Sequence, residues 1–269
     1  MIPVCEPFIT QREKDLVSDF LESGWISSAG KYLDLFESNW ASYCGMPHGV
    51  AVSNGSVALD LAMGIIELEP GDEVILPSFT IISCAQSVTS KGAKPVLVDI
   101  NADDWQMNVS EIASKITDKT KAILVVHLYG HPADMDPILE LAKKHNIYVI
   151  EDAAEVHGAE YRGRKCGGMA DLSTFSFYAN KLVTTGEGGM VLCRSDEHAE
   201  RARYLRNLCF QRSRRFYHEE IGSNYRLTNV QAALGVAQIE RIDETVERKR
   251  EIARYYQEAF AEVQCLQLP

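Results

Sequence analysis

The sequence predicts an α/β protein in which helices cover both faces of a mostly parallel central sheet. Helical and strand patterns alternate between residues 50 and 192, and the strand segments are continuously apolar. Strands of that kind are buried on both faces, which is typical of parallel sheets. Ligands of such sheets bind at the carboxyl ends of the strands. Five residues with functional side chains come just after predicted strands: Ser53, Phe79, His127, Asp152 and Lys181.

The predicted elements follow in order from the N-terminus. The first helix covers residues 11–23, because Leu16 and Phe20 recur at helical spacing and Gly24 ends it. The same periodicity predicts helices over residues 31–43, 57–66, 82–91, 109–116, 135–145, 195–208, 228–242 and 244–260. Short apolar runs predict strands over residues 50–52, 73–76, 95–99, 122–127 and 147–150, around Phe175 and Phe177, and over 190–192. Residues 263–268 are predicted to be the start of a further strand.

Length and composition limit the class of protein. The 269 residues suffice for one large domain, expected over 1–240, and for the start of a small C-terminal domain over 241–269. A formal charge of -11 disfavours nucleic acid as a partner, because no basic excess is left to neutralise phosphates. No apolar run is long enough to span a bilayer, and the first ten residues do not resemble a signal peptide.

The cysteines indicate the compartment. Seven are scattered along the chain without a CxxC pair. This spacing favours reduced thiols in the cytoplasm over disulfides or a zinc site, so no metal is predicted.

A single lysine, Lys181, lies between an apolar run and the glycine-rich turn 184–189. Burial of an ammonium is costly and lowers the pKa of a lysine, and such an amine forms a Schiff base with an aldehyde. A solvent-exposed lysine in a hairpin is the alternative, because lysines are rarely buried. Upstream, residues 53–56 join a strand to a helix, which favours an anion site at the helix N-terminus. The alternative there is an ordinary helix cap by Ser53 or Asn54.

An aldehyde and a phosphate together suggest pyridoxal 5'-phosphate, whose parts need specific partners. Asp152 would keep the pyridine nitrogen protonated, so that the ring acts as an electron sink. Phe79 would stack on the ring. Helix capping by Asp152 and core packing by Phe79 are the alternatives. The remaining contacts are predicted from Gly55, Ser56 and Ser176 to the phosphate and from Glu155 to the ring hydroxyl.

With these residues in place, the sequence resembles the DegT/DnrJ/EryC1/StrS family of pyridoxal-phosphate sugar aminotransferases. The resemblance rests on segments that include VAVSNGSVALDLAM, PGDEVILPSFT, VIEDAAEVHGAEYRG, FSFYANKLVTTGEGGMV and IGSNYRLTNVQAALGVAQIE, and it covers nearly all of residues 2–255. Within the family, the sequence is most similar to the perosamine-synthase-type enzymes. The basis is Asn180-Lys181, EDAAE at 151–155 and RFYHEEIGSNYRLTN from Arg215.

The resemblance implies a fold-type I aminotransferase, usually a homodimer in which both chains build each site. It implies Lys181 as the Schiff-base lysine and Asp152 as the partner of the pyridine nitrogen. It also implies that Phe79 stacks on the ring and that Gly55, Ser56 and Ser176 bind the phosphate, while Asn224 reaches the phosphate of the neighbouring subunit. Glu155 stands where many members have glutamine. Family members usually continue into a small domain that covers the site, so an incomplete small domain is expected here.

The implied reaction moves an amino group from L-glutamate to the 4-keto carbon of a nucleotide-linked 4-keto-6-deoxyhexose, with Lys181 as base and acid. The sugar nucleotide is expected to contact Trp25, Ser27, Lys31, Tyr217 and His218, although loop packing would also explain each of them.

Three other functions are weighed. Dehydratases of the same fold have histidine at the lysine position, so Lys181 disfavours that activity. A non-catalytic homologue is disfavoured by the intact Lys181 and Asp152. A dinucleotide-binding protein is disfavoured because no GxGxxG motif follows the first strand.

Overall fold

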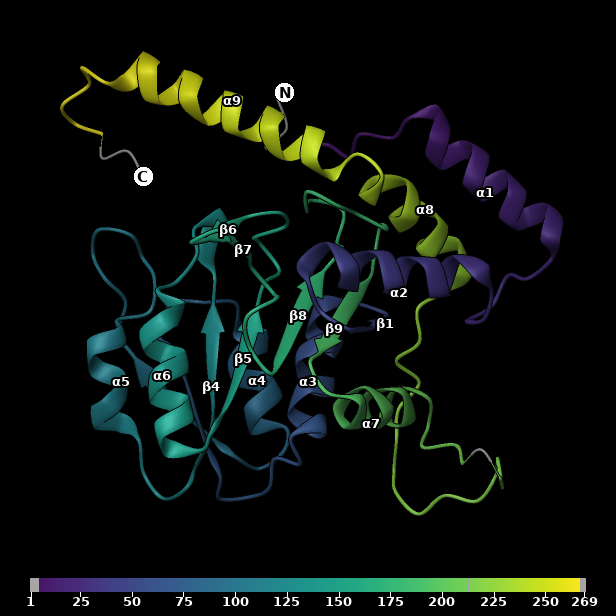
Figure 1. Ribbon diagram of the computed structural model, residues 1–269, viewed down its shortest axis with the longest axis horizontal. Helices are drawn as coiled ribbons and strands as arrows, with labels where there is room; N and C mark the ends of the chain where they lie inside the picture. The colour runs from purple at the N-terminus through teal and green to yellow at the C-terminus, as the bar shows by residue number, and fades with distance from the viewer. Residues whose placement is uncertain (1–4, 212, 267–269) are drawn as a thin grey trace.

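The computed structural model describes residues 5–211 and 213–266, and its centre is a seven-stranded sheet in the order β1-β9-β8-β5-β4-β2-β3 (Figure 1). Its strands are β1 (His48–Val52), β2 (Glu73–Pro77), β3 (Lys94–Val98), β4 (Thr120–Val126), β5 (Tyr148–Asp152), β8 (Leu172–Ser176) and β9 (Gly189–Cys193). β9 runs antiparallel to β1 and β8, and the other neighbouring strands pair in parallel. The predicted mostly parallel sheet is confirmed.

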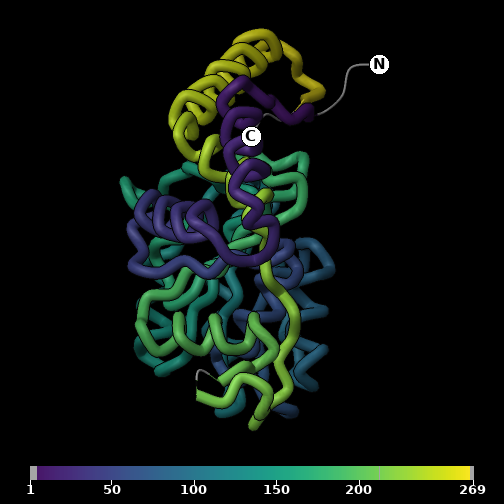
Figure 2. Tube along the Cα trace, turned by 90° about the vertical axis from the view of Figure 1, so that its right-hand side faces the viewer, coloured from purple at the N-terminus to yellow at the C-terminus, as the bar shows by residue number. Residues whose placement is uncertain are grey.

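Helices pack on both faces of the sheet (Figures 1 and 2). One face is covered by α3 (Gly55–Ile65), α4 (Ile82–Thr89) and α7 (Asp196–Arg206). The other is covered by α2 (Lys31–Cys44), α5 (Val109–Lys115), α6 (Met135–His145) and α8 (Asn229–Ile239), with α1 (Gln11–Ser23) against α8. In β4, Ile123 and Val125 belong to one core and Leu124 to the other, because successive side chains of a strand point to opposite faces. Two apolar cores therefore hold the sheet from both sides.

Local signals in the sequence set the helix ends. The side chain of Thr10 caps α1 in a capping box with Glu13, and the left-handed Gly24 at φ 70° ends that helix. A second capping box, from Thr228 to Gln231, starts α8. Such caps satisfy amides that have no acceptor inside the helix, and each contributes about 1 kcal/mol.

Two features differ from the sequence-based expectation. The predicted strand at 263–268 is wrong over residues 263–266, where the amide of Leu266 donates to the carbonyl of Val263 in a turn, and residues 267 and 268 lie outside the described range. A strand needs a neighbour for its ladder, and none lies beside this segment in the described part of the chain. The short hairpin of β6 (Glu160–Tyr161) and β7 (Arg164–Lys165) was not predicted, because two-residue strands leave no periodic pattern.

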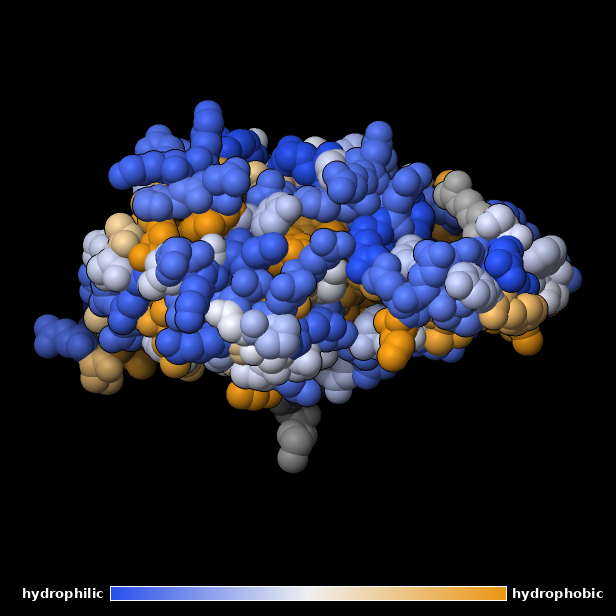
Figure 3. All heavy atoms as spheres, turned by 90° about the horizontal axis from the view of Figure 1, so that it is seen from below, coloured by the Kyte–Doolittle hydropathy of each residue, from blue (hydrophilic) through white to orange (hydrophobic). Residues whose placement is uncertain are grey.

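The last helix, α9 (Ile242–Phe260), crosses the molecule beyond the carboxyl ends of the strands (Figure 1). Its first turn packs on the rest of the chain, where Ile242 is buried and Tyr43 of α2 donates to Asp243 at 2.8 Å. The opposite end of the molecule, where the parallel strands begin, is mostly hydrophilic with small apolar areas between polar side chains (Figure 3).

Among the helices that the structure describes, none combines the length and the apolar character needed to cross a bilayer. No group of histidine, cysteine or carboxylate side chains within residues 5–211 and 213–266 is arranged to hold a metal ion, and all seven cysteines are free thiols.

Candidate active site

A cavity of about 590 Å³ opens at the carboxyl ends of the parallel strands. This volume lies within the range of small-ligand sites. Segments that follow β1, β2, β4, β5 and β8 all contribute to its walls, as the position of ligand sites in parallel sheets requires. The residues on its walls include Gly55 and the polar residues Asn54, Ser56, Ser83, His127, Asp152, Glu155, Thr174, Ser176, Asn180, Lys181 and Glu187.

Lys181 presents its amine to this cavity from the loop after β8. Its Nζ lies 3.2 Å from Oε1 of Glu155, and its side chain is 18% exposed. The other carboxylate oxygen of Glu155 accepts the backbone N–H of Tyr129 at 2.8 Å. Lys181 is thus a partly buried cation with one carboxylate partner, rather than the free surface lysine that was the alternative.

Asp152 ends β5 and lies on the same cavity, with only 4% of its surface exposed. Its Oδ1 accepts the N–H of Ala154 at 3.1 Å, and its Oδ2 accepts the thiol of Cys84 at 3.3 Å. Burial raises the pKa of Asp152, while these two hydrogen bonds and the positive charge of Lys181 act in the opposite direction. A cation placed against Asp152 would favour its charged form, which is what a protonated pyridine nitrogen provides.

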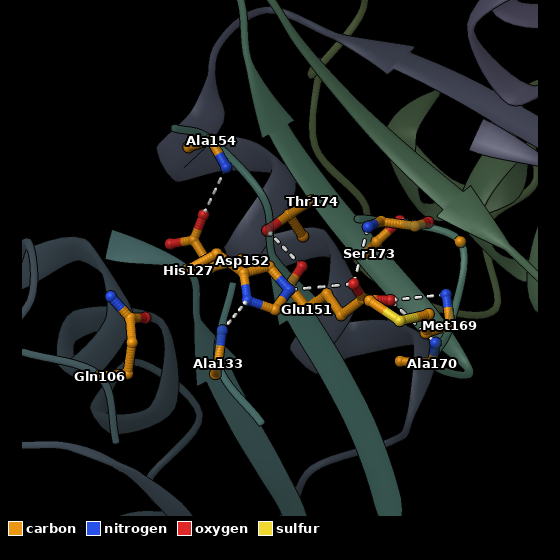
Figure 4. A network of polar contacts seen from close by, with 12 residues as sticks. Gln106, His127, Ala133, Glu151, Asp152, Ala154, Met169, Ala170, Ser173 and Thr174 are labelled. Carbon is orange, nitrogen blue, oxygen red and sulfur yellow. Dashed lines mark hydrogen bonds and ion pairs between the residues drawn. The ribbon is translucent and has the colours of Figure 1, made fainter. Parts of the chain in front are cut away.

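Glu151, the neighbour of Asp152 in β5, anchors the strand on the other side (Figure 4). It is fully buried and accepts the N–H groups of Gly167, Met169 and Ala170 at 2.6, 2.8 and 2.9 Å. Nε2 of His127 forms a fourth hydrogen bond with this carboxylate, 3.0 Å from Oε2 of Glu151. Because its Nδ1 accepts the N–H of Ala133 at 3.1 Å, Nε2 is the nitrogen that donates to Glu151. Burial would raise the pKa of Glu151, but the hydrogen bonds from His127 and from the loop amides outweigh it and hold this pKa below its ordinary value.

The N-terminus of α3 forms a cradle for an anion beside β8. The side chain of Asn54 caps the helix by accepting the N–H of Val57 at 2.9 Å, which settles the choice between Ser53 and Asn54. The amides of Gly55 and Ser56 come first in the helix, where no intrahelical acceptor exists. A Cβ on Gly55 would lie 2.7 Å from Cβ of Ser176, so glycine is required for this close approach.

His157 holds the loop that carries Lys181. It is 6% exposed, and its Nδ1 accepts the N–H of Val183, two residues after Lys181, at 3.2 Å. Burial first, and the charge of Lys181 second, lower the pKa of His157 to about 3, so the ring stays neutral at neutral pH. Its ring packs against Trp40, Phe175 and Phe177 with centroid separations of 5.0, 5.8 and 5.5 Å.

The predicted residues fall into two groups. One group shares the cavity: Gly55, Ser56, Asp152, Glu155, Ser176 and Lys181. Phe79 is not among the residues of the cavity wall; its ring is 44% exposed and packs edge-on against Trp105 and Tyr129 at 6.2 and 6.4 Å. Asn224 is exposed and bridges to Asn207. The five predicted substrate contacts are also exposed and lie outside the cavity wall: Trp25, Ser27, Lys31, Tyr217 and His218.

Some residues of the site had no predicted role. The thiol of Cys84 in α4 donates to Asp152, and His127 pairs with Glu151 in β5. The partners of each pair are far apart in the sequence, so no local pattern predicted these contacts. His127 was predicted only to follow a strand. The EDAAE segment carried the one signal for Glu151, since a charged residue inside an apolar strand must be paired.

The residues present fit pyridoxal phosphate. A reactive amine, a buried carboxylate and an anion-binding helix N-terminus surround one cavity, and the cavity lies where a parallel sheet binds its ligand. The fold and the site together define the class of pyridoxal-phosphate enzymes.

Comparison with known proteins narrows this class to one family. The DegT/DnrJ/EryC1/StrS aminotransferase family matches residues 7–269, and the chain belongs to this family. It is 46% identical over 260 residues to GDP-perosamine synthase of Caulobacter vibrioides, which covers 97% of this chain and 70% of that protein. It is 47% identical over 255 residues to GDP-perosamine synthase of Escherichia coli O157:H7, covering 95% of this chain and 70% of that protein.

Solved structures of aminotransferases superpose closely on this chain. The aminotransferase from Psychrobacter cryohalolentis superposes with a TM-score of 0.92 at 35% identity, covering 97% of this chain and 69% of that one. A Streptococcus pneumoniae relative in its PLP form superposes with a TM-score of 0.90 at 31% identity, covering 97% and 72%. The chain is a pyridoxal-phosphate-dependent aminotransferase, as the sequence predicted.

Proposed function

We propose that this enzyme transfers the amino group of L-glutamate to the 4-keto carbon of a nucleotide-linked 4-keto-6-deoxyhexose, in the manner of GDP-perosamine synthases. The product would be an amino sugar for a glycan such as O-antigen. The observation that carries the proposal is the meeting of Lys181 and Asp152 on one cavity, in a chain more than 40% identical to three GDP-perosamine synthases.

Each residue of the cavity would have a distinct task. Pyridoxal phosphate, when bound, supplies a ring that accepts electrons from the donor's α-carbon. Lys181 Nζ removes the α-proton of the amino donor and later returns a proton, as a general base and acid. Asp152 holds the cofactor ring in its protonated form. Gly55, Ser56 and Ser176 hold the phosphate and so fix the position of the ring relative to the amine.

Space for the sugar lies beside the amine. A second cavity, of about 690 Å³, shares Glu155, Asn180 and Lys181 with the first. Its α9 side carries Lys249 and Arg250, which suit the diphosphate of a sugar nucleotide. Lys181 also favours amino transfer over dehydration, because dehydratases of this fold are expected to have histidine at this position.

We further propose a cytoplasmic homodimer with shared sites. Asn224, Tyr217 and His218 lie outside the cavity of their own chain, as residues that serve a neighbouring subunit would, and Ile221 between them is 99% exposed. Seven free thiols suit a reducing compartment. We also propose a large domain over residues 1–240 and a small domain that begins at residue 241. The support is that Ile242 is the one buried residue of α9, so most of this helix is not part of the core.

The test uses L-glutamate labelled with heavy nitrogen and a GDP-linked 4-keto-6-deoxyhexose. Mass spectrometry should find the label in the sugar nucleotide, at carbon 4 by magnetic resonance. A deoxygenated product without nitrogen would replace the proposal with a dehydratase, and an unchanged substrate across GDP-, dTDP- and UDP-linked keto sugars would refute it.

A further inference from the structure

Cys84 contacts the carboxylate that would face the ring nitrogen of the cofactor. Its Sγ lies 3.3 Å from Oδ2 of Asp152, in a buried contact between α4 and the end of β5. We propose that Cys84 is a positioning residue for the reaction: its thiol donates a hydrogen bond to Asp152 and fixes the orientation of that carboxylate toward the cofactor ring. This inference rests on the proposed function, in which Asp152 is the partner of the ring nitrogen.

The carboxylate of Asp152 needs an external contact to hold its orientation. The last torsion of an aspartate side chain has no sharp preference, so hydrogen bonds set the plane of the carboxylate. Within residues 5–211 and 213–266, two groups donate to Asp152: the N–H of Ala154 at 3.1 Å and the thiol of Cys84. The amide is only two positions away along the chain. The thiol is therefore the contact that ties the carboxylate to a separate element, and each oxygen keeps a lone pair for the ring nitrogen.

A neighbouring hydroxyl determines the direction of this hydrogen bond. Cys84 is fully buried, and burial first, followed by the negative charge of Asp152, raises the pKa of its thiol, so the sulfur keeps its proton at neutral pH. An ionised carboxylate only accepts, so the S–H proton points to Asp152. Oγ1 of Thr80 lies 3.2 Å from the same sulfur and must then be the donor to it. The three groups form a chain from Thr80 through Cys84 to Asp152, in which each hydrogen bond strengthens the next.

Helix α4 fixes the position of the sulfur. Cys84 and Val88 are buried on the side of this helix that packs in the apolar core. On the cavity side of α4, Oγ of Ser83 lies 2.7 Å from Oγ of Ser56, which is one of the predicted phosphate contacts. The helix thus contacts both the phosphate cradle and Asp152, so it can hold the carboxylate at a fixed place relative to the cradle.

The test is the affinity of the cofactor-free protein for pyridoxal phosphate, measured by equilibrium dialysis. Cys84→Ser keeps a donor to Asp152 and an acceptor for Thr80, whereas Cys84→Val fills the space without a donor. The valine variant should lose about tenfold in affinity, the effect of one hydrogen bond to a charged group, and the serine variant should stay within about twofold of wild type. Packing alone would give the opposite order, because an apolar core tolerates a methyl group better than a hydroxyl group.

A double-mutant cycle tests whether Cys84 acts through Asp152. Asp152→Asn alone should weaken binding, and Cys84→Ala added to it should change the affinity by less than about twofold, because the carboxylate is already absent. The control position is Cys193, which is fully buried in the same apolar core but lies in β9. The same substitutions at Cys193 should leave the affinity unchanged. Thermal unfolding of each cofactor-free variant shows whether it is folded, and Cys84→Ala replaces Cys84→Val if the larger side chain prevents folding.

Wild-type affinity in Cys84→Val and Cys84→Ala would overturn the proposal, as would an undiminished effect of Cys84→Ala in the Asp152→Asn background. A serine variant that binds more weakly than the valine variant would assign Cys84 to packing instead. Nitrogen transfer from labelled glutamate is measured separately in the wild-type protein. Its absence, with the expected order of affinities, would refute the proposed function alone. Nitrogen transfer with unchanged affinity in the Cys84 variants would refute this inference alone.

Discussion

Replacing Glu151 by glutamine should destabilise the fold, although the two side chains have the same shape. Glu151 is fully buried, and its two oxygens accept four hydrogen bonds, from His127 and from the amides of Gly167, Met169 and Ala170. A glutamine has one acceptor oxygen, so its NH₂ group would face two of these donors. Rotation of His127 gives no relief, because its Nδ1 accepts the N–H of Ala133.

The magnitude follows from those contacts. Each buried donor left without an acceptor costs about 1–3 kcal/mol, so two of them cost about 4 kcal/mol. For a chain of this size, that cost lowers Tm by about 10 °C. The pKa of Glu151 is held below its ordinary value of 4.5, so the carboxylate stabilises the fold above that pH, and its contribution is lost as the pH falls further. The difference between variant and wild type should therefore shrink in acid.

Thermal unfolding at pH 7.5 and pH 4 measures both effects in the cofactor-free protein. Glu22→Gln, on the exposed surface of α1, is the matched control and should change the free energy of unfolding by less than about 0.5 kcal/mol. A Glu151→Gln protein with the Tm of the control would refute the assignment of Glu151 as the anchor of β5.

Two further predictions concern the cavity. Gly55→Ala should weaken cofactor binding and lower the free energy of unfolding by about 1–3 kcal/mol, because its Cβ would lie 2.7 Å from Cβ of Ser176. Equilibrium unfolding and cofactor titration measure the two effects. The control is Gly64→Ala in the same helix, which should have a far smaller effect because its Cβ meets only the flexible end of Leu205 at 3.2 Å. Asp152→Asn should stabilise the cofactor-free chain at neutral pH, because burial raises the pKa of Asp152 and the charged form is disfavoured there. The same variant should lose cofactor affinity, and a variant that is less stable without cofactor would contradict the argument.

The sequence predicted the fold because its signals are local. Continuous apolar runs marked the buried strands, and Gly24 marked the end of the first helix. Lys181, Asp152 and Gly55 were found together because parallel strands bring their carboxyl ends to one edge of the sheet.

What escaped prediction depends on contacts between distant segments. The thiol of Cys84 reaches Asp152 across 68 positions, and His127 reaches Glu151 across 24. No periodicity encodes such pairs. The pairing of Glu155 with Lys181 was likewise not predicted, because it depends on the turn at Tyr129, whose amide orients the carboxylate. Phe79 and Asn224 stay predictions as cofactor contacts, since their own chain places them outside the cavity wall.

The most direct measurement locates the cofactor on the chain. Purified protein is supplied with pyridoxal phosphate, reduced with borohydride, digested and analysed by mass spectrometry. We predict that the added mass lies on the peptide that contains Lys181, and that Lys181→Ala has neither the added mass nor the visible absorbance band. Attachment at another lysine, or a band that persists in Lys181→Ala, would contradict the account of this site.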